Sequence, residues 1–565
     1  MRLSRPQSSN FNMRVFSLSC LSVSFLPLLA SAVKRREIPK YDNTTYPKSH
    51  STYTKTTVAV LGAGLAGITT AQALSNQSID DFIIVEYNDV IGGRVVHTTF
   101  GGYTVELGAN WVQGLDSGVP GGPVNPIWIL AQKYNLSNTY SDYDSILTFD
   151  QTGYNDYSDL LDTFENAYSI MEEDAGYILT NNLQDRSMRA GFRLSGWEPC
   201  SMGDLQMAAE ATEWWKFDWE YAWTPEESSE LYATTNYNTS FYQWSDENNY
   251  VWDQRGFNTV VGEAYTFLSL NDTRLWLNTV VTNILYSDKG VTVYNEDGSC
   301  IDAKYAVCTF SVGVLQHDVV TFEPDLPVWK QQAIAGFQMG TYTKIFLQFS
   351  EIFWDPNTQF FLYASPTTRG YYPVWQSITA PGFLPDSGIF FVTVVKQQSY
   401  RIEKMSDEEV LAEVLAVLQQ MYPNITIPQP TAFMFPRWTQ VPWAYGSYSN
   451  WPPGMSLEMH QNLRANLGRL YFAGEATSAP YFGFLQAAYY EGREVGERIA
   501  GMLTGDCLNT NWKDTGTGNT TAGGVTCSND KHYVELHGTT PIEQYSEVNG
   551  WDAGSFIAYG YYSND

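Results

Sequence analysis

A glycine-rich stretch near the amino end, residues 58–94, constrains the fold more than any other part of the sequence. An apolar run, Val58–Leu61, leads directly into Gly62, Gly64 and Gly67, and an alanine- and threonine-rich segment of helical character follows. Such glycines allow a tight turn, close approach of a diphosphate to the backbone, and close packing of helix on strand. The stretch therefore predicts the β-α-β unit of a dinucleotide-binding domain.

The end of this stretch indicates which dinucleotide is bound. A second apolar run, Phe82–Val85, ends in Glu86, which is placed to accept hydrogen bonds from a ribose. Gly93 and Arg94 follow shortly after, and they allow a second backbone approach to the diphosphate beside a cation. A Gly-x-Gly-x-x-Gly pattern alone is weak, but the strand, helix and acid around it make the site specific. The second approach favours FAD over NAD.

The amino-terminal residues have the pattern of an export signal. Three arginines accompany an apolar run over residues 15–29, and Ala30-Ser31-Ala32 has the small residues of a cleavage site. The run is too short to span a membrane. We expect residues 1–32 to be a signal peptide and the protein to be secreted; a disordered or anchoring amino terminus is the alternative.

Composition agrees with export. The 565 residues include 32 basic and 61 acidic side chains, a net charge of −29, which argues against a nucleic-acid partner. The acidity serves solubility, and it also suits a cationic substrate. Seven Asn-x-Ser/Thr sequons predict N-glycosylation, at Asn43, Asn76, Asn135, Asn238, Asn271, Asn424 and Asn519.

The cysteines and histidines do not predict a metal site. Cys20 lies in the expected signal, so an odd number of the six cysteines remains. Cys507 and Cys527 flank a loop that they could close as a disulfide, and Cys308 lies in an apolar run typical of a buried strand. Neither cysteine nor histidine spacing fits zinc ligands, so we expect no metal.

The remaining pattern predicts an α/β protein of two interleaved domains. Helical patterns are expected at Tyr157–Leu179, Leu205–Tyr221, Asn258–Leu268 and 410–421, and strands at Val280–Tyr286, Gly290–Tyr294, Ala303–Thr309, Tyr342–Phe349 and Leu470–Ala473. We expect a discontinuous Rossmann-type FAD-binding domain and an α+β substrate-binding domain. The first comprises residues 53–130, 246–336 and 450–504, the second residues 131–245 and 337–449, and residues 505–565 form a tail.

Several separated motifs, in order, carry a resemblance. Besides residues 58–94, they are Glu106–Trp111, Asp253–Phe257, Thr309–Leu315, Gly340–Lys344, Gly446–Gly454 and Leu470–Gly492. With these motifs the chain resembles the flavin-containing amine oxidases, and among them the polyamine oxidases, from about residue 56 to 503. The resemblance implies non-covalent FAD, held by Gly62, Gly64, Gly67, Glu86, Gly93, Arg94, Gly108, Ala109, Asn110, Trp111, Val281, Gly474, Glu475, Phe484 and Leu485.

The resemblance also implies three residues at the reacting centre. Lys344 matches a lysine that holds a water near flavin N5, although strand alternation alone would equally allow it to face solvent. Tyr448 and Phe484 match an aromatic pair that encloses the substrate nitrogen; ordinary core packing is the alternative. Phe484 departs from the tyrosine often found there. Ser447 stands where monoamine oxidases have the cysteine that attaches the flavin, so the FAD should be non-covalent.

Substrate choice is less determined. Glu220, beside Tyr221, matches an acidic residue of the plant enzymes' substrate tunnel, and a surface acid is the alternative. Gln113 stands where plant enzymes have glutamate and animal enzymes have histidine. Glutamine can hydrogen-bond an amine but cannot balance its charge. These residues leave open which polyamine is preferred and which side of its nitrogen is cleaved.

Together these observations predict a secreted FAD-dependent polyamine oxidase with dioxygen as acceptor. The rival enzymes are a secreted L-amino acid oxidase, in which an arginine takes the place of Trp111, and a monoamine oxidase. A silent flavoprotein of the cell surface is the alternative of another class. An NAD dehydrogenase does not account for Arg94 or Lys344. Oligomeric state does not follow from the sequence.

Overall fold

The structure is a computed structural model that describes residues 52–181, 183–241, 244–269 and 271–505. Outside these ranges lie the expected signal peptide, the expected tail after Gly505, three of the cysteines (Cys20, Cys507 and Cys527) and two sequons (Asn43 and Asn519). By their contacts the described residues all belong to one unit. Among the described helices, none is both long and apolar enough to cross a membrane.

The first sheet is built on the glycine-rich stretch. Strand β1 (Thr54–Leu61) lies between β2 (Phe82–Val85) and β13 (Cys300–Cys308) and pairs parallel with both. The sheet order is β10-β2-β1-β13-β12-β11-β14, with β22 (Leu470–Phe472) also paired to β13. The other strands are β10 (Leu275–Trp276), β11 (Val281–Ser287), β12 (Gly290–Asn295) and β14 (Thr321–Glu323). The predicted parallel β-α-β unit is confirmed.

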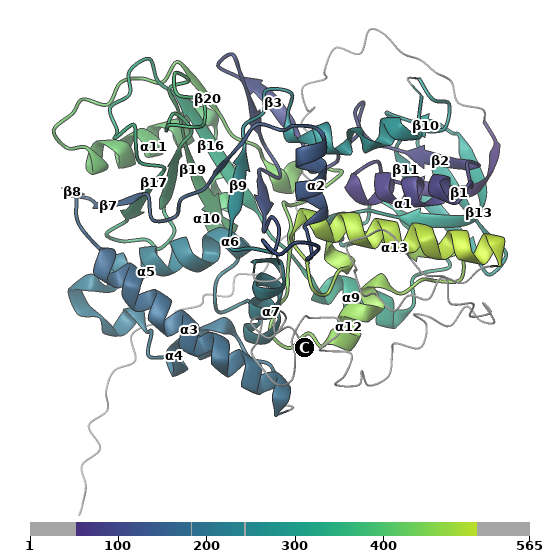
Figure 1. The fold of residues 1–565 in the computed structure, drawn as a ribbon, viewed down its shortest axis with the longest axis horizontal. Helices are drawn as coiled ribbons and strands as arrows, with labels where there is room; N and C mark the ends of the chain where they lie inside the picture. Colours follow the sequence, from purple (N-terminus) through teal and green to yellow (C-terminus); the bar gives the residue numbers. More distant parts are fainter. Residues whose placement is uncertain (1–51, 182, 242–243, 270, 506–565) are drawn as a thin grey trace, which may run out of the picture. The chain divides into compact units, whose positions relative to one another are not determined.

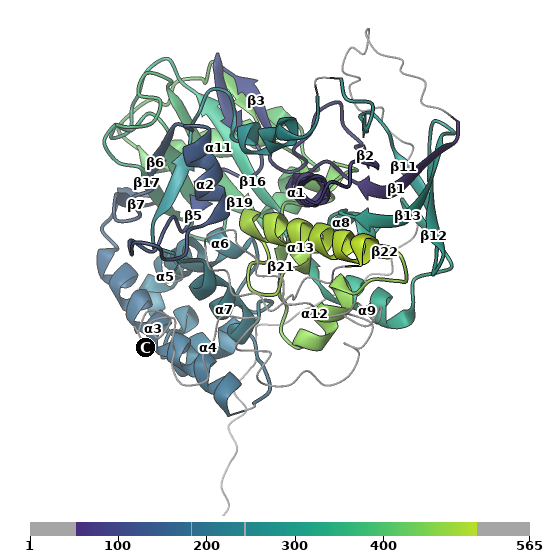
Figure 2. The same cartoon turned by 45° about the vertical axis from the view of Figure 1, so that its right-hand side comes forward.

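Two helices from opposite ends of the sequence cover one face of this sheet. Helix α1 (Leu65–Asn76) lies beside α13 (Leu485–Thr504), as Figures 1 and 2 show. Val58 and Val60 of β1 belong to the cluster beneath these helices, while alternate residues of β1 belong to the cluster on the other face. Burial on both faces is why the strand is a continuous apolar run.

The second sheet lies to the left in Figure 1 and has the order β20-β16-β19-β18-β17-β7-β8. Its strands are β7 (Ile146–Asp150), β8 (Gly153–Tyr154), β16 (Tyr342–Gln348), β17 (Phe360–Ala364), β18 (Val374–Ser377), β19 (Ile389–Val395) and β20 (Ala432–Met434). Helix α11 (Asp407–Met421) packs on it through buried residues at helical spacing. Ser406 and Glu409 begin α11 with a capping box. The helix predicted at 410–421 is confirmed.

A helical region accompanies the second sheet. It comprises α3 (Ser158–Thr180), α4 (Met188–Leu194), α5 (Gln206–Glu213), α6 (Trp219–Tyr221) and α7 (Glu230–Phe241). The helix expected at Leu205–Tyr221 is not continuous: a π-helical turn, Trp214–Asp218, separates α5 from α6. The helix expected at Asn258–Leu268 is a 3-10 helix, Phe257–Thr266, which places Val260, Val261 and Ala264 in the core. Apolar spacing alone does not distinguish these helix types.

A small three-stranded sheet has the order β5-β9-β6 and carries Trp111 and Gln113 on β5 (Trp111–Gln113). Its partners are β6 (Asn138–Tyr140) and β9 (Asn248–Val251). The remaining elements are β3 (His97–Phe100), β4 (Tyr103–Glu106), α2 (Pro126–Lys133), α8 (Val312–Leu315), α9 (Val328–Gly336), β15 (Gln338–Met339), α10 (Lys396–Ile402), β21 (Ser449–Asn450) and α12 (Leu457–Arg464), with short 3-10 helices at Pro199–Ser201, Gly203–Leu205, Trp438–Gln440 and Glu475–Thr477.

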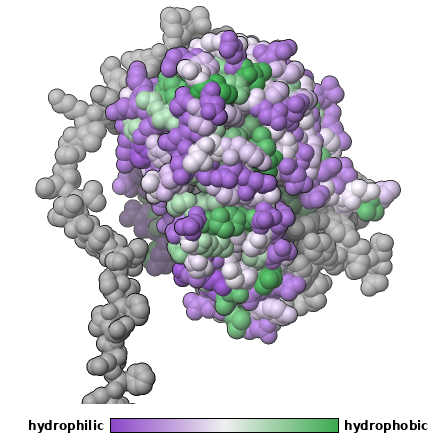
Figure 3. All heavy atoms as spheres, turned by 90° about the vertical axis from the view of Figure 1, so that its left-hand side faces the viewer, coloured by the Kyte–Doolittle hydropathy of each residue, from purple (hydrophilic) through white to green (hydrophobic). Residues whose placement is uncertain are grey.

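The two-domain α/β architecture predicted from the sequence is confirmed as a fold class. Strands of the first sheet come from residues 54–85, 275–323 and 470–472, and those of the second from residues 146–154, 342–395 and 432–434. The domain boundaries themselves stay predictions. Cys308 is buried, as expected for a core strand. On the face shown in Figure 3, hydrophilic side chains predominate and apolar ones gather in small groups between them.

Candidate active site

The dinucleotide loop has the geometry that its glycines predicted. Gly62 has φ +109°, and a side chain there would collide with Thr309; a side chain at Gly67 would collide with the carbonyl of Gly62. At Gly64 a Cβ would meet no atom closer than 4.0 Å. The loop therefore leaves open space at Gly64, directly before the first amides of α1, where a diphosphate would approach.

Glu86 ends β2 beside this loop. Its Oε2 accepts a hydrogen bond from the Ala63 amide at 2.7 Å, and its Oε1 accepts two from Asn88. Burial raises the pKa of Glu86, and these hydrogen bonds oppose that rise. The carboxylate is thus fixed at the strand end with lone pairs left for ribose hydroxyls. Val281 begins β11 in the same sheet, with its side chain buried.

Arg94 and Glu475 join the two ends of the FAD region. Nη1 of Arg94 lies 2.7 Å from Oε1 of Glu475 and donates to the carbonyl of Ser447. Oε2 of Glu475 accepts from the hydroxyl of Ser449 and from the amide of Gly483. The Nε and Nη2 groups of Arg94 make no hydrogen bond within the described part of the chain. They are available to an anion.

The remaining predicted cofactor residues lie around this ion pair. Gly93 has φ +57° and approaches the backbone of Gly64. Gly108 lies so close to the Arg94 carbonyl that a side chain would collide with it. Gly474 precedes Glu475, and a Cβ there would meet nothing nearer than 4.0 Å. The amide of Ala109 donates to the Arg94 carbonyl. These contacts gather both ends of the expected FAD site.

The residues present fit FAD. The first turns of α1 and α13 have no side-chain caps and no acidic residue, so their amides are free to meet anionic groups. Phe484 is the N-cap of α13 and Leu485 its first residue. Gly64, Arg94 and the start of α1 would hold the diphosphate, Glu86 a ribose, and the start of α13 the flavin ring. When bound, FAD would supply the oxidant, since its flavin ring can accept a hydride from a substrate.

Lys344 faces the interior, so the solvent-facing alternative is wrong. It is 1% exposed on β16, and its ammonium donates to the Gly108 carbonyl at 2.9 Å and to Oδ1 of Asn110. It also lies 5.8 Å from the ring centroid of Trp111. Burial lowers the pKa of Lys344, and the charge of Glu106 opposes this. The third ammonium proton remains for a water.

Gln113 and Glu220 meet directly. Nε2 of Gln113 donates to Oε1 of Glu220 at 3.0 Å, so the predicted pair lies together although more than 100 residues separate its members. Glu220 is half-buried, and burial raises its pKa to about 7, while the hydrogen bond from Gln113 opposes the rise. The surface alternative for Glu220 is therefore wrong.

Tyr448 of the expected aromatic pair lies next to Glu220. The hydroxyl of Tyr448 donates to the main-chain carbonyl of Glu220 at 2.7 Å. A Cβ at Gly483 would lie 3.4 Å from Cδ2 of Tyr448, so the residue preceding Phe484 touches the Tyr448 ring. Phe484 is 6% exposed and also packs on Phe241. The structure therefore places Gly483, the chain neighbour of Phe484, next to the Tyr448 ring.

Tyr221 does not belong to this group. Its ring stacks on Phe217 at 4.6 Å, and its hydroxyl donates to the carbonyl of Ala233 inside the helical region. Successive residues of a helix point in different directions, and Glu220 is the one directed to Gln113. The prediction that Tyr221 contacts substrate is not supported by its position.

Sequence reasoning missed two residues. Tyr342 is two residues before Lys344 on β16, which puts both on one face of the strand, and its ring lies 6.0 Å from that of Tyr448. Strand alternation could have identified it. Glu106, at the end of β4, is buried and interacts with the charge of Lys344; its Oε1 accepts from the Phe257 amide at 2.6 Å. Burial raises the pKa of Glu106.

Comparisons with known proteins agree with this geometry. A model of the flavin-containing amine oxidoreductases matches residues 65–500. Polyamine oxidase 1 of Zea mays is 39% identical over 460 residues, 78% of this chain and 89% of the maize protein. Polyamine oxidase 7 of Oryza sativa subsp. japonica is 38% identical over 453 residues, 77% and 93% of the two chains. A solved structure of wild-type putrescine oxidase bound to putrescine has the same fold, with a TM-score of 0.62, 17% identity and coverage of 79% and 99%.

Proposed function

Because this chain belongs to the flavin-containing amine oxidoreductases and is an FAD-dependent amine oxidase, we propose that its substrates are polyamines such as spermidine, spermine or their acetylated forms. The observation that carries the proposal is that Glu220 lies beside Tyr448, with its carboxylate bound by Gln113. A polyamine has a second cationic nitrogen at a distance from the reacting one, and a half-buried carboxylate suits it. The similarity to plant polyamine oxidases over most of the chain supports the same substrate class.

Different residues of the site bind the substrate, exclude water and hold a proton. Glu220 binds a distal ammonium, while Tyr448 and Phe484 exclude water around the reacting nitrogen and favour its neutral form, whose lone pair is free. Lys344 holds a water or proton next to Gly108 and Asn110. Transfer of a hydride from the carbon beside the neutral nitrogen to bound FAD would leave an iminium ion, which water hydrolyses to an aminoaldehyde and a smaller amine.

Gln113 adjusts this site. Its amide donates to Glu220 and adds no negative charge of its own. One carboxylate, rather than two, therefore faces the substrate at this pair. We expect a preference for substrates that present one ammonium at this position. The distance from that ammonium to the reacting nitrogen then determines which carbon beside the nitrogen is oxidised.

Anaerobic mixing with polyamines tests the proposal. The visible absorption of the bound flavin should bleach with spermidine, spermine or their acetylated forms, and air should then restore it with release of hydrogen peroxide. Mass spectrometry of the products identifies the cleaved bond. A panel of L-amino acids and monoamines serves as control. If the amino acids or monoamines yield hydrogen peroxide and no polyamine bleaches the flavin, the substrate assignment is wrong.

We also propose that the protein is secreted and N-glycosylated. Four sequon asparagines in the described part of the chain are exposed, at Asn76, Asn135, Asn271 and Asn424. Asn238 is different: it lies in α7 and is only 6% exposed, so its sequon cannot take a glycan in the folded protein. Glycosidase treatment of the exported protein should lower its mass in steps that peptide mapping assigns to exposed sequons. An unmodified protein that stays inside its cell would contradict this proposal.

A further inference from the structure

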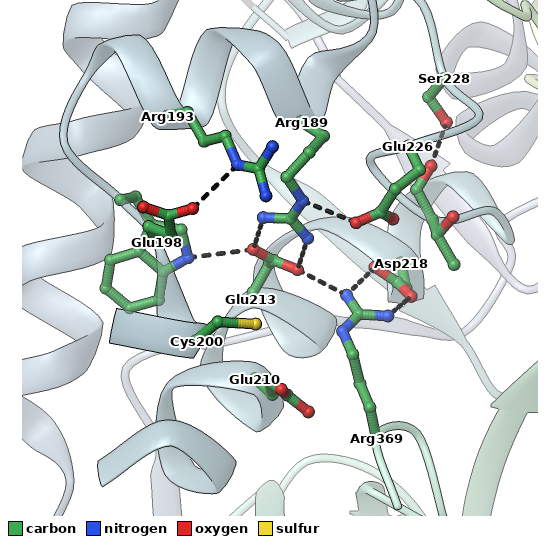
Figure 4. A network of polar contacts seen from close by, with 12 residues as sticks. Arg189, Arg193, Glu198, Cys200, Glu210, Glu213, Asp218, Glu226, Ser228 and Arg369 are labelled. Atoms are coloured by element: carbon green, nitrogen blue, oxygen red, sulfur yellow. Dashed lines mark hydrogen bonds and ion pairs between the residues drawn. The ribbon is translucent and has the colours of Figure 1, made fainter. Parts of the chain in front are cut away.

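A buried ionic network includes two acidic residues shortly before Glu220 in the sequence, Glu213 and Asp218 (Figure 4). At its centre Glu213 is fully buried and accepts two hydrogen bonds from Arg189, at 2.5 and 2.6 Å, and one from Arg369 at 2.8 Å. Arg369 also binds both oxygens of Asp218, at 2.5 and 2.7 Å. Glu226 binds Arg189 from the rim. The network therefore joins α4, α5, the π-helical turn and the β17–β18 connection.

Arg369 touches both ends of the π-helical turn. Glu213 is the residue before Trp214–Asp218, and Asp218 is its last residue. Within the turn, the Trp219 amide donates to the Trp214 carbonyl five residues back. Isolated π turns are rare and need support from their surroundings, and they recur at functional sites. One guanidinium bridging the two ends is such a support.

The π turn determines where Glu220 points. It contains one residue more than an α-helical turn, so its relaxation to α-helix would rotate the following residues by about 100° around the axis. Glu220 lies two residues after Asp218 in α6, which Ala222 ends at φ +56°. A rotation of that size would move Glu220 away from Gln113 and displace the carbonyl that Tyr448 binds.

The network does not look built for stability. Three carboxylates face two guanidinium groups, and burial raises the pKa of Asp218 to about 7 in spite of Arg369. Above that pH the ionised form of Asp218 costs folding free energy, because the folded state binds its proton more tightly than the unfolded chain. Buried ion pairs of this kind often contribute little net stability.

We infer that Arg369 is a positioning residue, which holds the π-helical turn and so directs Glu220 towards the substrate. This rests on the proposed polyamine substrate. Lysine at position 369 keeps the charge but cannot bind Asp218 through two nitrogens while also reaching Glu213. Arg369→Lys should therefore raise KM for the polyamine about 10- to 100-fold, with kcat almost unchanged.

A double variant with Glu220→Gln distinguishes a positioning role of Arg369 from a general loss of structure. Glu220→Gln should raise KM by itself, and adding Arg369→Lys to that variant should have little further effect, because the directed group is already lost. Arg193→Met is the matched control, since Arg193 lies near this network but, among the described residues, pairs only with Glu198, at 3.1 Å and exposed to solvent. It should change neither constant.

The outcomes are distinct. The inference is overturned if the KM of the double variant rises by the product of the two single effects. It is also overturned if Arg369→Lys changes kcat alone. If Arg369→Lys loses FAD, Asp218→Asn replaces it, and loss of FAD in both variants would show a purely structural network. If the wild type oxidises no polyamine, the proposed function fails, but the positioning role can still be tested. Amide hydrogen exchange over residues 214–222 should be faster in Arg369→Lys than in the wild type, and equal exchange would contradict the positioning role.

Discussion

Lys344 is the residue whose chemistry depends most on its surroundings. Two of its three ammonium protons go to Gly108 and Asn110, which leaves one for a water at the reacting centre. Lys344→Met should lower turnover about 100- to 10,000-fold, in the range that loss of a proton-transfer group produces. Stopped-flow measurements of flavin bleaching and of reoxidation in air will show which half-reaction is slowed.

Lys289→Met is the control for that variant. Lys289 is exposed on the β11–β12 turn, so its removal should leave both half-reactions unchanged. Equal rates for wild type and Lys344→Met would remove Lys344 from the reaction.

Glu220 predicts a pH dependence of substrate binding. With a pKa of about 7, its carboxyl group is neutral below that pH and cannot balance an ammonium, while above it the carboxylate can. KM for a polyamine should therefore fall as pH rises through 7. In Glu220→Gln, KM at pH 8 should be about 10- to 100-fold higher, as expected for loss of a charge-assisted hydrogen bond, and independent of pH near 7. A wild-type KM that rises with pH would contradict this assignment.

At this scale the sequence was a better guide to which residues lie together at the candidate site than to the direction of each side chain. Gln113 and Glu220 were identified through a resemblance, and the structure places them in contact. Tyr221 was included because it follows Glu220, but helix geometry turns it into the core. The direction of a side chain depends on the helix type before it, which residue spacing does not reveal.

Among the elements, the helices α1 and α13 pack closely through glycines of α13. A Cβ at Gly496 would lie 2.5 Å from the Thr70 carbonyl and 2.7 Å from Cβ of Ala73, and one at Gly492 would collide with Ala66. Gly496→Ala should lower the free energy of unfolding by about 1–3 kcal/mol, the usual cost of overpacking. It should also weaken FAD retention, because α13 begins at the flavin end of the site.

Gly262→Ala is the matched control for this packing. A Cβ at Gly262 would meet no atom within 4 Å, so the change in unfolding free energy should stay within about 0.5 kcal/mol. Chemical denaturation of both variants with FAD bound measures the difference. Equal stability would mean that the two helices separate easily.

Elements with a clear period were predictable and those without one were not. The buried run of β1 and the amphipathic α11 follow from spacing alone. Residues 205–221 are apolar and aromatic on several sides, so their pattern gave no sign of the π turn at Trp214–Asp218. The contact that supports that turn comes from Arg369, 150 residues later, and no local pattern contains it.

For the whole molecule, FAD should act as a structural ligand as well as a reagent. Its expected contacts run from Gly62 to Leu485, and Ser447 offers no thiol for a covalent bond. Removing FAD should lower the melting temperature, since a ligand present at 1,000 times its Kd stabilises the native state by about 4 kcal/mol. Acid precipitation should leave FAD in the supernatant. Flavin remaining on the pellet would contradict non-covalent binding.

The ion pair between Arg94 and Glu475 also bears on how the protein is made. A chain grows from its amino end, so β1, the glycine loop and Arg94 exist long before Glu475 and α13 leave the ribosome. Until then the loop lacks both its counter-charge and the helix that covers it. Cofactor loading is therefore a late event of biosynthesis, and a prematurely terminated chain would carry the dinucleotide motif without the capacity to keep a flavin.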